Sequence, residues 1–127
     1  MTPVIALGNR DAGDDAAGPL VADALRAAGR DVFEPRDVLE LAELLAAGGP
    51  VIVVDAAAAE GFAGPRRARS SHGLGLEEAV GLAAALGAHP ALKVYAIVGH
   101  DFRPGSPLSA SVSAAVERVT REILRCA

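Results

Sequence analysis

The sequence predicts an α/β fold, a three-layer αβα sandwich with a mostly parallel, twisted sheet of about five strands. Short apolar runs rich in β-branched residues alternate along the chain with longer segments of helical spacing, which favours parallel strands and right-handed crossovers. The run VIVVDA, residues 51–56, is apolar up to its aspartate, as is typical of a central strand covered on both faces. The length of 127 residues fits one domain, so we expect residues 1–127 to form a single unit.

The strands are predicted from apolar, β-branched runs bounded by glycine, proline or charged residues. The run VIAL ends at Gly8, and LKVYAIVG forms a second long buried strand. The irregular stretch between residues 57 and 75 is expected to hold a short edge strand. The predicted strands lie at 4–7, 31–34, 51–56, 66–69 and 92–99.

The helices are predicted from apolar residues at helical spacing and from their stop signals. Asp37 followed by Glu40 resembles a capping box, and the helix that it opens stops at Gly48. Gly29 and Gly87 are expected to end two other helices. The predicted helices lie at 19–28, 38–47, 76–86 and 109–124.

Composition excludes several classes of function. A net charge of −4 and an aromatic content of 3% argue against nucleic-acid binding. The one cysteine, Cys126, permits no disulfide within the chain and no cysteine-based zinc site. No stretch is long and apolar enough to span a membrane, and the N-terminus lacks the basic start of a signal peptide. We expect a cytoplasmic protein with no nucleic-acid or membrane partner, and nothing demands an oligomer, so we expect a monomer.

Acidic residues and a histidine are predicted to meet beyond the carboxyl ends of the strands, where functional groups collect in parallel sheets. Asp14 and Asp15 follow the first strand, and Asp55 closes the strand at 51–56. His72 lies in the loop before a helix, and His100, directly after the last strand, is the rival histidine. Helix capping is the competing explanation for the paired aspartates. Two carboxylates and an imidazole suit a divalent cation such as zinc, nickel, manganese or iron.

Four segments, in order, give the chain its resemblance to a known family: GNRDAGDDAAG, VIVVDA, SSHGLGLEEA and SPLSASV. They resemble the hydrogenase maturation endopeptidases, whose opening pattern is Gly-Asn, four residues, Asp, then Asp or Glu. Gly8, Asn9, Asp14 and Asp15 match this pattern in register, and the resemblance covers most of the chain.

The resemblance implies an aspartic-type endopeptidase that removes a C-terminal peptide from the large-subunit precursor of a nickel–iron hydrogenase after nickel insertion. It implies that Asp15, Asp55 and His72 are the catalytic and metal-contacting residues, with Asn9 and Asp14 supporting them. The metal is then nickel supplied by the substrate, or another divalent ion.

Two alternatives remain at this point. One is a receiver-like domain in which Asp14, Asp15 and Asp55 hold Mg²⁺ and Asp55 accepts a phosphoryl group. The absence of a lysine after the last strand weighs against it, because the one lysine, Lys93, lies at the start of its strand. The other is a non-catalytic protein with the protease fold.

Overall fold

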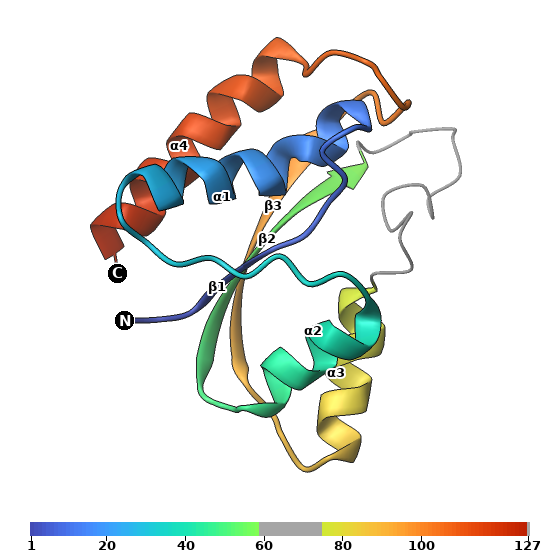
Figure 1. Ribbon diagram of the computed structural model, residues 1–127, viewed down its shortest axis with the longest axis vertical. Helices are drawn as coiled ribbons and strands as arrows, with labels where there is room; N and C mark the ends of the chain where they lie inside the picture. The colour runs from blue at the N-terminus through green and yellow to red at the C-terminus, as the bar shows by residue number, and fades with distance from the viewer. Residues whose placement is uncertain (59–74, 127) are drawn as a thin grey trace.

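Among the residues that the structure describes, the sheet has three parallel strands in the order β1, β2, β3 (Figure 1). The computed structural model describes residues 1–58 and 75–126, so the strand expected at 66–69 lies outside the described residues. In register, Ile5 of β1 lies beside Val53 of β2, and Asp55 of β2 lies beside Ala96 of β3. The strands are β1 (Val4–Ala6), β2 (Pro50–Ala58) and β3 (Ala91–Gly99).

Of the five expected strands, three form within the described residues, and the one at 66–69 lies outside them. Residues 31–34 contribute only an isolated parallel bridge, in which Phe33 pairs with Ile5. The Phe33 N–H donates to the Val4 carbonyl oxygen, and the Phe33 carbonyl accepts from the Ala6 N–H, each at 2.9 Å. Pairing ends there because Pro35 has no N–H to donate to the ladder.

The helices agree with the expected segments to within a few residues. Asp37 caps α2 as predicted, since its side chain accepts the Glu40 N–H at 2.8 Å. The Glu40 side chain accepts the N–H of Arg36 at 2.6 Å, one residue before the cap, so both acids satisfy free donors at this helix start. The helices are η1 (a 3₁₀ turn, Gly13–Ala16), α1 (Ala17–Ala27), α2 (Val38–Ala46), α3 (Leu76–Ala85) and α4 (Ala110–Cys126).

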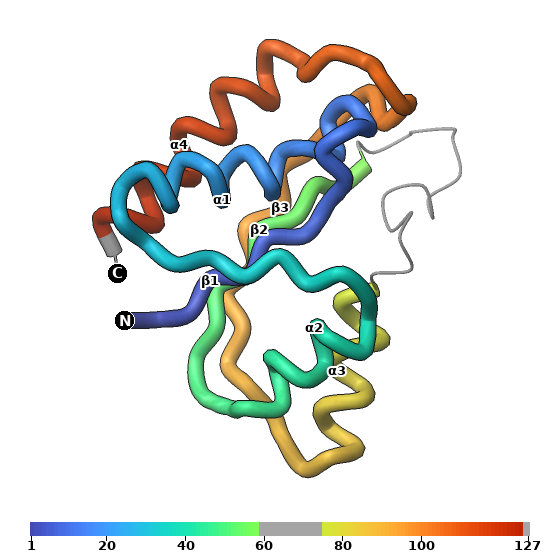
Figure 2. Tube along the Cα trace, viewed as in Figure 1, coloured from blue at the N-terminus to red at the C-terminus, as the bar shows by residue number. Residues whose placement is uncertain are grey.

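The helices cover both faces of the sheet, which confirms the three-layer αβα architecture (Figure 2). Alternate residues of each strand face opposite sides, so β2 supplies both cores. One core joins α1 and α4 to one face through Val4, Ile52, Val54, Leu25, Val112, Val116 and Ile123. The other joins α2 and α3 to the opposite face through Ile5, Val51, Val53, Leu41, Leu45, Ala79 and Ala83.

The carboxyl ends of β1 and β2 form the switch point of the sheet. The Phe33 bridge lies on one side of β1, and β2 lies on the other side. After β1 the chain therefore first runs to the Phe33 bridge and then crosses back to form β2 on the opposite side of β1. The helices that follow, α1 and α2, accordingly pack on opposite faces. A crevice outside the strand ends at such a point is the usual ligand site in open α/β sheets. Within residues 1–58 and 75–126, no helix is long and apolar enough to cross a membrane.

Candidate active site

Asp15 lies in the turn that leaves β1, within η1, and is fully buried. Its backbone N–H donates to the Ala12 carbonyl at 3.0 Å. One of its carboxylate oxygens, Oδ2, accepts the backbone N–H of Asn9 at 2.9 Å. The Asn9 side chain in turn accepts the N–H of Asp11 at 2.9 Å, which closes the turn on itself. The backbone of residues 9–12 therefore fixes the position of the Asp15 carboxylate.

Gly8 allows this turn to lie directly against Asp15. Its φ is +139°, and a Cβ added there would overlap the carbonyl oxygen of Asp15. The next contact of such a Cβ would be Pro19, at 3.1 Å. A side chain at position 8 would therefore push the strand end away from η1.

Asp14 is also fully buried, and it accepts four hydrogen bonds from a segment far along the chain. Ser109 donates its backbone N–H and its hydroxyl, each at 2.7 Å. The backbone N–H groups of His100 and Asp101 donate at 2.7 and 3.1 Å. Burial on its own would raise the Asp14 pKa, but these donors outweigh it and hold the pKa below the ordinary value.

Neither aspartate caps the helix that follows it, because α1 and η1 both begin without a side-chain cap. Asp14 instead joins the first turn to the segment between β3 and α4. The Asp14 N–H strengthens this connection by donating to the Asp101 carbonyl at 2.8 Å. The capping explanation for the pair on their own helix is therefore wrong, and the two acids have separate partners.

Asp55 lies within β2 and is partly exposed. The strand was expected to end at this residue, but three more residues pair with β3 as far as Ala58. In this extension the three alanines lie beside Ile97, Val98 and Gly99 of β3. The side chain of Asp55 accepts the N–H of Ala56 at 2.8 Å. By strand alternation it lies on the same face as Val51 and Val53, the face covered by α2 and α3.

The structure brings the turn that carries Asp15 against the strand that carries Asp55. The 3₁₀ turn η1 packs on β2. The Leu7 N–H, just after β1, donates to the Val54 carbonyl at 2.9 Å, next to Asp55. Gly18 permits the contact, because an added Cβ there would meet the carbonyl oxygen of Leu7 and, at 3.1 Å, that of Val54. Both acids therefore belong to the carboxyl edge of the same sheet.

The histidines are placed differently. His72 lies outside the described residues. His100 donates its backbone N–H to Asp14, and the residue lines a hollow of about 480 Å³ between β3 and α4, together with Tyr95, Arg118 and Glu122. Within residues 1–58 and 75–126, no three histidine, cysteine, aspartate or glutamate side chains are grouped to hold a metal ion. Asp15 and Asp55 each carry a carboxylate, whose oxygens are the kind of hard donor that a divalent cation accepts as a ligand.

Two features of this region were not predicted from the sequence. Ser109 was expected only as the start of the last helix, although a serine directly before a helix is a signal for a polar contact at that end. The charged residues Arg10, Asp23, Arg26 and Glu34 form a network beside the turn, and only the i,i+3 spacing of Asp23 and Arg26 indicates any part of it. Next to this network is a shallow pocket of about 330 Å³, lined by Gly8, Asn9, Arg10, Asp11, Glu34 and Arg36 among others.

Known structures share this fold over nearly the whole chain. A hydrogenase 2 maturation peptidase from Thaumarchaeota archaeon SCGC_AB-539-E09 is 25% identical, with a TM-score of 0.65, and 98% of this chain matches 96% of that one. The hydrogenase maturating endopeptidase HybD from Escherichia coli is 21% identical, with a TM-score of 0.75 and coverage of 98% and 91%. The [NiFe] hydrogenase maturation protease HybD from Thermococcus kodakarensis is 23% identical, with a TM-score of 0.71 and coverage of 98% for both chains.

At the level of sequence, no protein-family model and no curated protein matches the chain. The similarity therefore rests on the three-dimensional arrangement, which includes the turn after β1 and the carboxyl edge of the sheet. The resemblance found in the sequence is confirmed: the chain has the fold of the hydrogenase maturation endopeptidases.

Proposed function

We propose that this protein is an endopeptidase that removes a C-terminal peptide from the large-subunit precursor of a nickel–iron hydrogenase. The observation that carries the proposal is the convergence of Asp15, in the turn after β1, and Asp55, in β2, on one edge of a sheet. That sheet belongs to a fold shared with proteins named as hydrogenase maturation peptidases. We also propose that it acts in the cytoplasm.

Asp15, Asp55 and His72 are proposed to contact the nickel that the precursor carries, so the metal belongs to the substrate. Carboxylate and imidazole ligands suit this borderline cation. Asn9 holds Oδ2 of Asp15 in place, and Asp14 fixes the same turn to the start of α4. The role of these supporting residues is to set the direction of the Asp15 carboxylate before the substrate arrives, which reduces the cost of ordering it on binding.

Peptide hydrolysis needs a group that accepts a proton from the attacking water and returns it to the leaving amine. Asp55 is partly exposed, whereas Asp15 is fully buried, so we assign the proton transfer to Asp55. Water adds to the scissile carbonyl carbon, its proton passes to the carboxylate, and the C–N bond breaks as that proton is delivered to the amine. The bound nickel presents the scissile bond to these groups.

The receiver-like alternative is disfavoured by the position of Asp55. That alternative places the phospho-accepting aspartate at the end of its strand, whereas three residues after Asp55 still pair with β3.

The test is cleavage of a nickel-loaded large-subunit precursor, followed by gel shift or mass spectrometry, with wild-type protein and with Asp15→Asn and Asp55→Asn. Each substitution keeps the side-chain shape and removes the charge, so processing should fall below detection while circular dichroism stays unchanged. The matched control is Asp11→Asn, an exposed aspartate in the same turn, which should process the precursor normally. Full processing by both Asp15→Asn and Asp55→Asn contradicts the proposal, and a wild-type protein that cleaves no precursor supports the non-catalytic alternative.

A further inference from the structure

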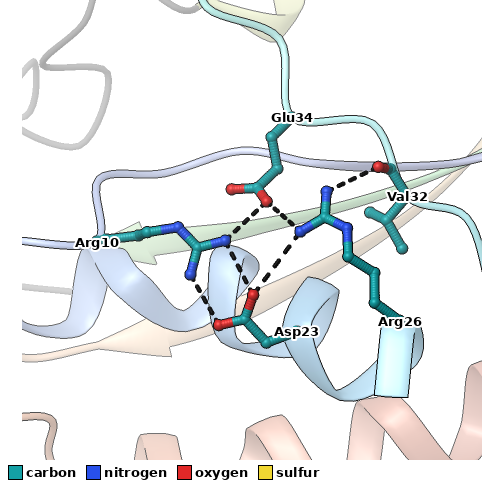
Figure 3. A network of polar contacts seen from close by, with 5 residues as sticks. All are labelled: Arg10, Asp23, Arg26, Val32 and Glu34. Carbon is teal, nitrogen blue, oxygen red and sulfur yellow. Dashed lines mark hydrogen bonds and ion pairs between the residues drawn. The ribbon is translucent and has the colours of Figure 1, made fainter. Parts of the chain in front are cut away.

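Four charged side chains form a closed network on the surface beside the Asp15 turn (Figure 3). Arg10 makes two hydrogen bonds to Asp23, at 2.7 and 3.0 Å, and one to Glu34, at 2.7 Å. Arg26 bonds Glu34 at 2.6 Å and lies 3.7 Å from Asp23. Its guanidinium also donates to the Val32 carbonyl at 2.8 Å. Each acid is therefore shared by both arginines.

The two arginines connect different parts of the chain. Asp23 and Arg26 both belong to α1, and Glu34 follows the Phe33 bridge, which fixes it beside β1. Arg10 is the member that comes from the turn after β1. If Arg10 is removed, Arg26 still links α1 to Glu34. If Arg26 is removed, Arg10 still holds both acids. Only the loss of Arg10 separates this network from the turn, which the Gly105 N–H also holds by donating to the Asp11 carbonyl at 2.7 Å.

The turn held by Arg10 is the one that bonds Asp15. The neighbouring residue, Asn9, donates its N–H to Asp15 Oδ2 at 2.9 Å. The segment 8–11 is thus fastened to the helical stretch at two points, to Asp15 in η1 and, through Arg10, to Asp23 two turns further on in α1. We propose that Arg10 is a positioning residue, which orients the Asp15 carboxylate by holding the Asn9 N–H against it. This inference rests on the proposed role of Asp15 in contacting the metal.

The geometry of the network suits it to hold the turn in place. We expect it to contribute little to the overall stability of the protein. Arg10, Asp23 and Arg26 are each more than 40% exposed at the side chain, and exposed ion pairs contribute little to folding. The Arg10 guanidinium, however, bonds two carboxylates at once in a fixed planar fork, which restricts direction as well as distance. The hydrogen bond from Arg10 also holds the Asp23 pKa below its usual value, so the network favours the charged carboxylate.

The experiment compares Arg10→Ala with Arg26→Ala. Both variants remove one guanidinium from the same two acids, so they match in charge and in loss of ion pairs. Amide hydrogen exchange measured by NMR reports the Asn9 N–H directly. We expect Asn9 in Arg10→Ala to exchange about fivefold to tenfold faster than in Arg26→Ala and wild type, with little change in midpoint of thermal unfolding. Equal protection of Asn9 in all three proteins overturns the proposal.

The second readout is Cd²⁺ affinity, measured by calorimetry as a stand-in for the substrate metal. If only electrostatics mattered, removing a positive charge near a cation site should make Cd²⁺ bind more tightly. If Arg10 positions the site, its removal should make Cd²⁺ bind more weakly. We expect Arg10→Ala to bind Cd²⁺ about tenfold more weakly than Arg26→Ala, with Arg10→Lys intermediate because an ammonium keeps the charge but lacks the planar fork of the guanidinium. Unchanged or tighter binding by Arg10→Ala overturns the proposal. If wild type binds no Cd²⁺ and cleaves no precursor, the proposed function fails, and Asn9 exchange alone decides whether Arg10 orders the turn.

Discussion

Asp14 and Ser109 are joined by two hydrogen bonds although 95 residues separate them in the chain. The Ser109 N–H donates to one carboxylate oxygen of Asp14 and the Ser109 hydroxyl to the other, each at 2.7 Å. Ser109 directly precedes α4, and Asp14 directly precedes Asp15. This pair therefore fixes the start of the last helix to the turn that carries the candidate active-site carboxylate.

Asp14→Asn should destabilise the protein more than Ser109→Ala does. The amide retains one acceptor oxygen and turns an NH₂ group toward buried donors, so it leaves several hydrogen bonds unmade. We expect a loss of about 3 kcal/mol of unfolding free energy for Asp14→Asn and about 1 kcal/mol for Ser109→Ala, which removes only the hydroxyl donor. Urea denaturation checks both values. Equal and small losses of unfolding free energy in both variants would show that the connection between the turn and α4 contributes little to stability.

The stabilisation from Asp14 should depend on pH in a defined direction. Its pKa in the folded protein lies below the ordinary carboxylate value of 3.8, so the folded state favours the charged form. The contribution is then fully present above that value and is lost as the pH falls through the folded pKa. The difference in unfolding free energy between wild type and Asp14→Asn should therefore shrink below about pH 4. A difference that grows in acid would contradict this pKa shift.

Two glycine substitutions should have opposite effects. Gly8→Ala places a Cβ on the Asp15 carbonyl at a φ of +139°, so it should cost about 2 kcal/mol or more and disturb the turn. Gly81 lies inside α3, and an added Cβ there meets nothing within 4 Å. Gly81→Ala should therefore stabilise the protein by about 0.5–1 kcal/mol. Thermal unfolding shows whether each variant is less or more stable than the wild type. A Gly8→Ala variant as stable as the wild type would contradict the close approach of Gly8 to the Asp15 carbonyl.

Local sequence signals predicted most of the fold. The apolar periodicity located the helices and the long strands, and the Asp37–Glu40 pattern located the start of α2. These features depend on neighbours within one or two turns. The strand at 31–34 was reduced to one bridge because its length depends on a partner strand and on Pro35, and short apolar runs carry little information about pairing.

The candidate site was predicted less completely. The sequence indicated Asp15 and Asp55 on one sheet edge, because the alternation of elements predicts parallel strands, whose carboxyl ends lie at the same edge. It did not indicate that Asp14 bonds Ser109, or that Arg10 bonds Asp23 and Glu34, since such contacts join residues that only the folded chain brings together. His72 lies outside the described residues, so its role stays a prediction.

The central claim is that Asp15, Asp55 and His72 together contact the metal of the substrate. A crystal of the protein soaked in Cd²⁺, with the ion located by its anomalous scattering, tests this claim most directly. The account predicts one ion with a carboxylate oxygen of Asp15, a carboxylate oxygen of Asp55 and an imidazole nitrogen of His72 in its coordination sphere. An ion bound elsewhere on the chain, with none of these three residues as ligands, would contradict it.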